Sequence, residues 1–95
     1  MAVAPNGKKS AVIALTNGAG ASVQLVASND QRLSLIILNN SAGIAYVGTA
    51  PGPITAANGL PLAAGASLTD TTSGDPWWVF SVAAADMRCL ETSAD

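Results

Sequence analysis

The side chains best suited to acid–base chemistry are two pairs of carboxylates, Asp70 with Asp75 and Asp86 with Glu91. Paired carboxylates can act as general acid and base without histidine. Both pairs flank predicted turns, where Asp more often accepts hydrogen bonds from the local backbone. A calcium site formed by Asp70, Asp75 and loop carbonyls is an alternative, but the spacing does not fit an EF-hand loop. We therefore expect these carboxylates to be structural.

Other catalytic patterns are missing from the sequence. The chain has no histidine, which removes Ser–His and Cys–His dyads and most zinc sites. It has no CxxC, no P-loop motif and no GxGxxG; Gly18 and Gly20 form only a GxG fragment in a predicted hairpin. We expect a protein that is not an enzyme and that has no catalytic residue, no metal and no cofactor.

Cys89 is the only cysteine, so it cannot form a disulfide within the chain. The run Met87-Arg88-Cys89-Leu90 alternates as a strand does, which places Cys89 on the face of Met87 and opposite Arg88. We expect a small, buried, apolar side chain; the alternative is a reactive thiol.

The charges are sparse, with four basic and six acidic residues among 95 and a net charge of −2. A nucleic-acid surface needs clustered Lys and Arg, so we expect no nucleic-acid partner. No apolar run approaches the roughly 18 residues of a membrane helix, and no secretory signal is evident. A weakly charged surface is cheap to desolvate. This favours a domain that covers much of its surface with partners, over a monomer with a bland surface.

Short apolar runs separated by turn residues occur along the whole chain. The runs 11–16, 22–27, 32–38, 44–48, 60–62, 67–71, 77–82 and 87–92 read as strands. Helical periodicity is missing. Seven to eight short strands at this spacing predict an all-β fold, an antiparallel β-sandwich or small barrel of Greek-key or jelly-roll type. We expect an N-terminal arm over residues 1–10 and one domain over residues 11–95.

Three elements are candidates for contact with a partner. The arm carries Lys8 and Lys9, although a solvated tail is the simpler interpretation. The irregular segment 49–59 contains Pro51, Pro53 and Ile54, and its prolines favour an extended form that reaches away from the body.

The third candidate is the adjacent pair Trp77 and Trp78, whose side chains point to opposite faces of a strand. One should enter the core, and the other should lie outward as an interface anchor or a platform for a sugar. Plain packing of both rings is the alternative. Arg32 and Arg88 lie near acidic residues, and we expect any ion pair there to be a surface feature of little energetic weight.

The order of these motifs resembles small structural proteins of tailed bacteriophages. The matching pattern is Arg32-x-Ser-Leu-Ile-Ile-Leu-Asn39, Ser41 to Gly43, Ile44-Ala-Tyr-Val-Gly48, Gly59-Leu-Pro-Leu62, Gly65, an aromatic-led strand and Arg88 to Glu91, within about Gln24 to Thr92. The resemblance implies a β-sandwich that attaches to virions and has no catalytic motif. It also implies turn roles for Asn39 and Gly43, a packed Tyr46, and hinge roles for Gly48 and Gly59.

The role that the resemblance favours is a capsid decoration (cement) protein, which stabilises the head by bridging capsid subunits. The implied partner is the major capsid protein or another virion protein, and the implied oligomer is a homotrimer. The implied location is the capsid surface of the virion, after synthesis in the host cytoplasm. The alternative is a receptor-binding, glycan-binding or structural module of a phage tail fibre or baseplate.

Overall fold

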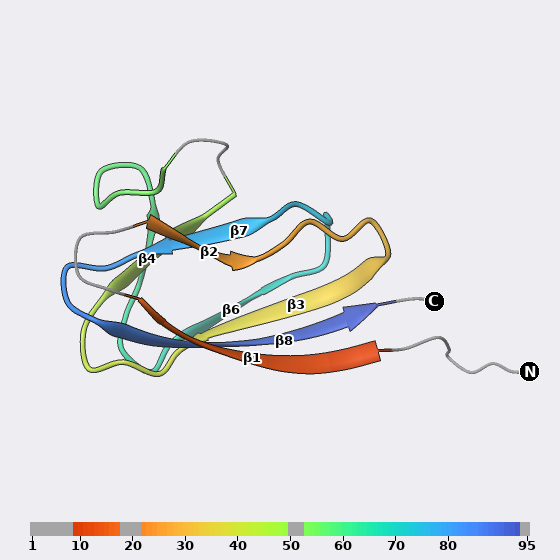
Figure 1. Cartoon of the computed structure of the whole chain (residues 1–95), viewed down its shortest axis with the longest axis horizontal. Coiled ribbons are helices and arrows are strands. Elements are labelled where there is room, and N and C mark those ends of the chain that lie inside the picture. The colour runs from red at the N-terminus through yellow and green to blue at the C-terminus, as the bar shows by residue number, and fades with distance from the viewer. Residues whose placement is uncertain (1–8, 18–21, 50–52, 94–95) are drawn as a thin grey trace, which may run out of the picture.

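The computed structural model describes residues 9–17, 22–49 and 53–93, and these form eight strands (Figure 1). In chain order the strands are β1 (Lys9–Asn17), β2 (Ser22–Val26), β3 (Arg32–Asn39), β4 (Ala45–Gly48), β5 (Leu60–Leu62), β6 (Ser67–Asp70), β7 (Trp77–Phe80) and β8 (Ala85–Ser93). None of the described segments forms a helix of the length and apolarity that a membrane crossing requires.

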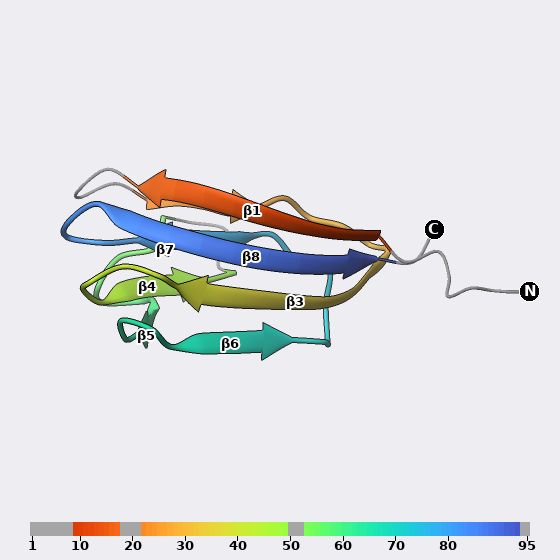
Figure 2. The same cartoon turned by 90° about the horizontal axis from the view of Figure 1, so that it is seen from below.

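The strands form two four-stranded sheets with the orders β1-β8-β3-β6 and β2-β7-β4-β5. All pairings are antiparallel. The chain passes between the two layers so that the first and last strands pair with each other, and Figure 2 shows β1, β8, β3 and β6 side by side. This is the order of an eight-stranded jelly roll. The predicted all-β sandwich is confirmed, and the jelly roll is selected from the expected topologies.

The core lies between the sheets because alternate residues of each strand are apolar. From the first sheet Leu35, Ile37 and Met87 are fully buried, and from the second Val47 and Val79 are. Leu35 and Ile37 lie two positions apart on β3, as the two-residue period of a strand requires. Val47 lies opposite Val79 in register, and Ile37 lies opposite Cys89. The first sheet also buries Cys89, as its alternation with Arg88 predicted.

The strand boundaries lie close to the predicted runs, with three differences that matter below. β7 ends at Phe80, so Ser81 and Val82 belong to the following connection. β1 begins at Lys9, two residues before the predicted run 11–16. β4 begins at Ala45, so Ile44 belongs to the preceding turn.

The sandwich has two distinct ends (Figure 1). We call one the turn end; it holds the connections 40–44, 63–66 and 81–84. We call the other the loop end; it holds the connections 27–31 and 71–76. At the loop end the Asn29 amide donates to the Gly74 carbonyl across 2.8 Å. A Cβ at Gly74 would lie 2.1 Å from the Asn29 oxygen, so this contact requires glycine.

Candidate protein-interaction surface

The carboxylate of Asp70 is occupied by its own turn. It accepts hydrogen bonds from the Thr72 amide (2.9 Å), the Thr72 hydroxyl (2.8 Å), the Ser73 hydroxyl (3.4 Å) and the Trp77 indole (3.3 Å). These bonds, the Thr72 amide first, lower the pKa of Asp70. Asp75 contributes its backbone carbonyl to Arg32. The structural role predicted for the turn aspartates is therefore observed at Asp70.

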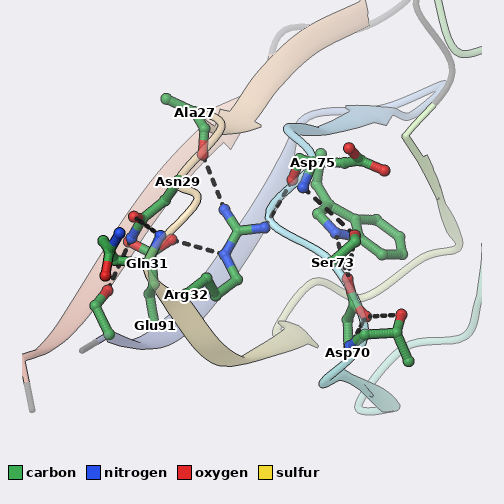
Figure 3. Close-up of polar contacts among 11 residues, drawn as sticks. Ala27, Asn29, Gln31, Arg32, Asp70, Ser73, Asp75 and Glu91 are labelled. Atoms are coloured by element: carbon green, nitrogen blue, oxygen red, sulfur yellow. Dashed lines mark hydrogen bonds and ion pairs between the residues drawn. The ribbon is translucent and has the colours of Figure 1, made fainter.

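Glu91 is held by Arg32 (Figure 3). The arginine Nε donates to Glu91 Oε2 across 2.8 Å, while its terminal nitrogens donate to the carbonyls of Asp75 (2.7 Å) and Ala27 (2.8 Å). The Arg32 side chain is fully buried. The expectation of a weak surface pair is thus wrong for Arg32, because this guanidinium lies beneath both connections of the loop end.

Asp86 and Glu91 form the second candidate pair of carboxylates in the sequence. The Asp86 carboxylate accepts hydrogen bonds from Arg88 Nε (3.0 Å) and from Asn40 Nδ2 (3.0 Å). The Arg88 hydrogen bond is the main reason that the pKa of Asp86 is lowered. Here the ion pair is half-exposed, as predicted. In the described part of the chain no group of three or more Cys, Asp or Glu residues is placed to hold a metal ion.

Burial raises the pKa of Cys89 to about 11, with a smaller contribution from the charge of Glu91. The residue is only 1% exposed and packs in the core. A buried, protonated thiol is a poor nucleophile, so the structural interpretation of Cys89 holds.

The predicted contact segment 49–59 is anchored to the body at Ile54, although residues 55–58 are exposed. Ile54 is buried at 1% exposure, and its amide donates to the Ser22 hydroxyl across 3.0 Å. A Cβ at Gly48 or Gly59 would come within 2.8 Å of the Ile54 side chain, so these glycines make room for Ile54. Ile54 as a partner-contact residue is therefore wrong, because it closes this segment onto the second sheet.

The other predicted contact residues divide by location. Pro53 is exposed. Lys8 and Pro51 lie outside the described residues, and for Lys9 the structure describes only the backbone position in β1.

Trp77 and Trp78 lie on opposite faces of β7, as predicted, but neither is freely exposed. Trp77 packs against the core and lines a shallow groove with Thr49, Leu60 and Asp70. Trp78 lies opposite Gln24 and Gly48 in register. Its indole nitrogen is buried and has no hydrogen-bond partner among the described residues.

Of the three most exposed large apolar side chains among the described residues, two lie at the turn end, while Leu60 (56%) lines the groove beside Trp77. Val82 is 73% exposed and Ile44 is 51% exposed. They come from different connections but line the same shallow depression, together with Tyr46 and small residues. We call this the turn-end surface; its members are Ser41, Gly43, Ile44, Tyr46, Ser81, Val82, Ala83, Ala84 and Ala85.

Hydrogen bonds attach the connection 40–44 to the start of β8, and within the connection 81–84 the Ser81 hydroxyl donates to the Ala83 carbonyl. The Ser41 hydroxyl accepts from the Asp86 amide (2.6 Å), and the Asn40 amide donates to the Asp86 carbonyl (2.9 Å). Beneath them the fully buried Asn39 donates to the carbonyls of Gly43 (2.9 Å) and Leu62 (2.8 Å). Ile44 and Val82 are therefore presented on a preorganised base.

The comparisons with known proteins add one finding about the fold. No family model matches the chain, and no curated protein does. A solved structure described by the words "Bacillus endospore appendages form a novel family of disulfide-linked pili" is similar, with a TM-score of 0.61 and 18% identity. The match covers 93% of this chain and 88% of that chain. At this identity the similarity concerns the fold, and it agrees with the sandwich described above.

Sequence reasoning missed Ile44 and Val82 because both looked like ends of strands. Their neighbours carried the available signal. Ile44 follows Ser-Ala-Gly, and Val82 precedes three alanines. A large aliphatic residue beside small turn residues has nothing within its own turn to cover it.

Proposed function

We propose that this chain is a structural protein that binds other protein surfaces in a repeating assembly, as a capsid decoration protein of a tailed bacteriophage does. The observation that carries the proposal is the joint exposure of Ile44 and Val82 on one rigid end of the sandwich. Full burial of an aliphatic side chain of this size contributes about 1.5–3 kcal/mol. Two such residues on a base that needs no reordering can anchor a small protein to a repeated site.

The carboxylates support a structural role over a catalytic one. Asp70, Asp86 and Glu91 each serve a neighbouring turn or arginine in the fold. None of the three is left as an exposed, unpaired acid beside a second one, as a general acid–base pair would need.

The capsid exterior is the location that the sequence pattern favours. The weakly charged surface suits a protein-covered lattice, and the resemblance described above points to the virion. The partner in this proposal is the major capsid protein, contacted through the turn-end surface. The resemblance implied a trimer, but the proposed contact through the turn-end surface does not depend on the oligomeric state.

Undecorated, expanded capsids mixed with the purified protein provide the test. We expect binding that saturates at a fixed ratio to capsid subunits, together with a higher temperature of capsid rupture. Ile44→Ser combined with Val82→Ser should abolish both effects. Because both side chains are exposed, the free energy of unfolding should change by less than about 1 kcal/mol.

Leu33→Ser is the matched control, because Leu33 is 49% exposed but lies at the start of β3, at the loop end. It should bind as the unmodified protein does. Absence of binding to capsids, or equal loss of binding in Leu33→Ser, would contradict the proposal. Binding to tails or to a bacterial surface glycan instead would favour the tail-module alternative.

A second candidate is a subunit of an extracellular filament, which the fold of the spore-appendage structure suggests. In this chain a disulfide link through Cys89 is opposed by its burial. A filament would then be non-covalent. Electron microscopy of the concentrated protein tests this, and filaments that persist in reducing agent would favour it over capsid decoration.

A further inference from the structure

The four sheet edges of the sandwich are not equally protected. β5 has three residues and contains Pro61, β6 has four residues and ends at Asp70, and β2 has five residues with a register shift between Gln24 and Val26. Shortness, proline, charge and bulges are the features that stop an edge strand from pairing with another chain.

β1 has only one of these features, a charge at its first residue. Its nine residues pair with β8 in one unbroken register, from Lys9 opposite Ser93 to Asn17 opposite Ala85. It contains no proline, and its charge is confined to the first residue. In the part of the chain that the structure describes, no strand pairs with its other side. A long edge of this kind offers a row of backbone donors and acceptors to a further strand.

We propose that the free edge of β1 pairs antiparallel with β1 of a second copy, centred on Ile13. The strand reads Lys-Ser-Ala-Val-Ile-Ala-Leu-Thr-Asn, two polar residues at each end and five apolar residues between them. This order is the same in both directions. Centring on Ile13 sets Ser10 opposite Thr16, Ala11 opposite Leu15 and Lys9 opposite Asn17, so polar residues meet polar residues and the lysines stay apart.

Neighbouring registers match the strand less well. A register centred on Val12 sets polar Lys9 opposite apolar Leu15, and one centred on Ala14 sets apolar Ala11 opposite polar Asn17. Each of these registers also leaves residues at the strand ends without a partner. Cross-strand pairs of matched polarity stabilise antiparallel sheets, which selects the Ile13 centre.

The symmetry of this pairing determines the assembly. Antiparallel self-pairing is isologous, so it closes with two copies. The two-fold axis is perpendicular to the sheet, which keeps the inner face of each first sheet on the same side and joins both first sheets into one. The result is a dimer, in place of the trimer implied by the resemblance. The pairing uses a sheet edge and no residue of the turn-end surface. Because β1 pairs antiparallel, the turn-end surfaces of the two copies lie at opposite ends of the dimer, so one copy of each dimer can face a given lattice.

Charge pairing tests the register. In the proposed dimer, Ser10 of each copy faces Thr16 of the other, so S10K/T16K sets lysine against lysine twice, and S10E/T16E sets glutamate against glutamate twice. Like charges directly opposite are destabilising. Each variant alone should dimerise at least about tenfold more weakly than the unmodified protein. An equal mixture of the two should form a heterodimer.

Sedimentation equilibrium, with a protomer mass of 9.4 kDa, measures the association, and tryptophan fluorescence confirms that each variant is folded. S67K/T69K adds the same charge to the exposed positions of edge strand β6 and should leave the dimer intact. As a second measurement, the outward amides of residues 10–16 should exchange more slowly with deuterium at higher protein concentration.

A dimer that responds in this way supports the proposal. A monomer at about 1 mM, a trimer, equal weakening by S67K/T69K, or a mixture that does not reassociate would overturn it. Capsid binding by a protein that is monomeric in solution would reject this pairing and leave the proposed function standing. A protein that dimerises in this way but does not bind capsids would support this pairing and reject the proposed function.

Discussion

Arg32 Nε lies 2.8 Å from Glu91 Oε2, and the arginine side chain that makes this ion pair is fully buried. The same guanidinium donates to the carbonyls of Ala27 and Asp75, which lie in or beside the two connections of the loop end. One side chain thus joins β3 to β8 and holds both connections. Lysine cannot reproduce this, because it lacks the planar fork of five donors.

Arg32→Met should lower the free energy of unfolding by about 3–5 kcal/mol, because it leaves Glu91 mostly buried without its partner. Urea denaturation followed by tryptophan fluorescence measures the change. Arg88→Met is the matched control, since the Arg88–Asp86 pair is half-exposed, and it should change stability little. Equal losses of unfolding free energy in the two variants would contradict the claim that the buried Arg32–Glu91 pair contributes more to stability than the half-exposed pair.

Asn39→Asp should destabilise the protein by about 2–4 kcal/mol. The amide of Asn39 donates to the carbonyls of Gly43 and Leu62, and a carboxylate would oppose both oxygens. Since Gly43 belongs to the turn-end surface, capsid binding should weaken as well. Thermal unfolding and the capsid assay together test this, and a variant as stable as the parent would refute the account of Asn39.

The carboxylate of Asp70 should make stability depend on acid pH. Its pKa is lowered in the folded protein, so its contribution is complete above its ordinary value of 3.8 and is lost as the pH falls through the folded value. Urea midpoints at pH 7 and pH 2.5 should differ less in Asp70→Asn than in the parent. Thr72→Val removes one donor to this carboxylate and should give an intermediate difference.

Alkaline pH should act through Cys89. Its pKa is raised to about 11 from an ordinary value of 9.0, so above pH 9 the unfolded chain ionises first. Stability should fall by about 2–3 kcal/mol between pH 9 and pH 11. In Cys89→Ala this part of the decline should be absent, which urea titrations at each pH would reveal. Parallel declines in the two proteins would contradict the assignment.

The strands and their inward faces were predictable because alternation of apolar and polar residues is a local property. Leu35, Ile37 and Cys89 lie where the alternation placed them. The fate of Ile54 was not predictable, because it depends on two glycines, Gly48 and Gly59, that leave room for it from different elements. Proline content suggested an extended segment, whereas the long-range contact decided the outcome.

The turn-end surface could not be predicted from local sequence either. Ile44 and Val82 lie in separate connections, 38 positions apart in the chain, and only the strand order brings them to one depression. Arg32 was misjudged for a related reason. Its local sequence resembles a strand end at the surface, but the connection with Asp75 and the partner carboxylate of Glu91 lie 43 and 59 positions away in the chain.

The register of β1 with β8 places Lys9 beside Ser93, at the opposite end of β8 from the turn-end surface. If a single copy binds a lattice through the turn-end surface, as we propose, a peptide or domain fused ahead of Lys9 or after Ser93 would therefore emerge on the side that faces away from that lattice. Both fusion points would be open at once, and neither would pass across Ile44 or Val82. Each copy that binds in the proposed orientation could thus carry two different cargoes, displayed side by side and directed away from the surface to which it is bound.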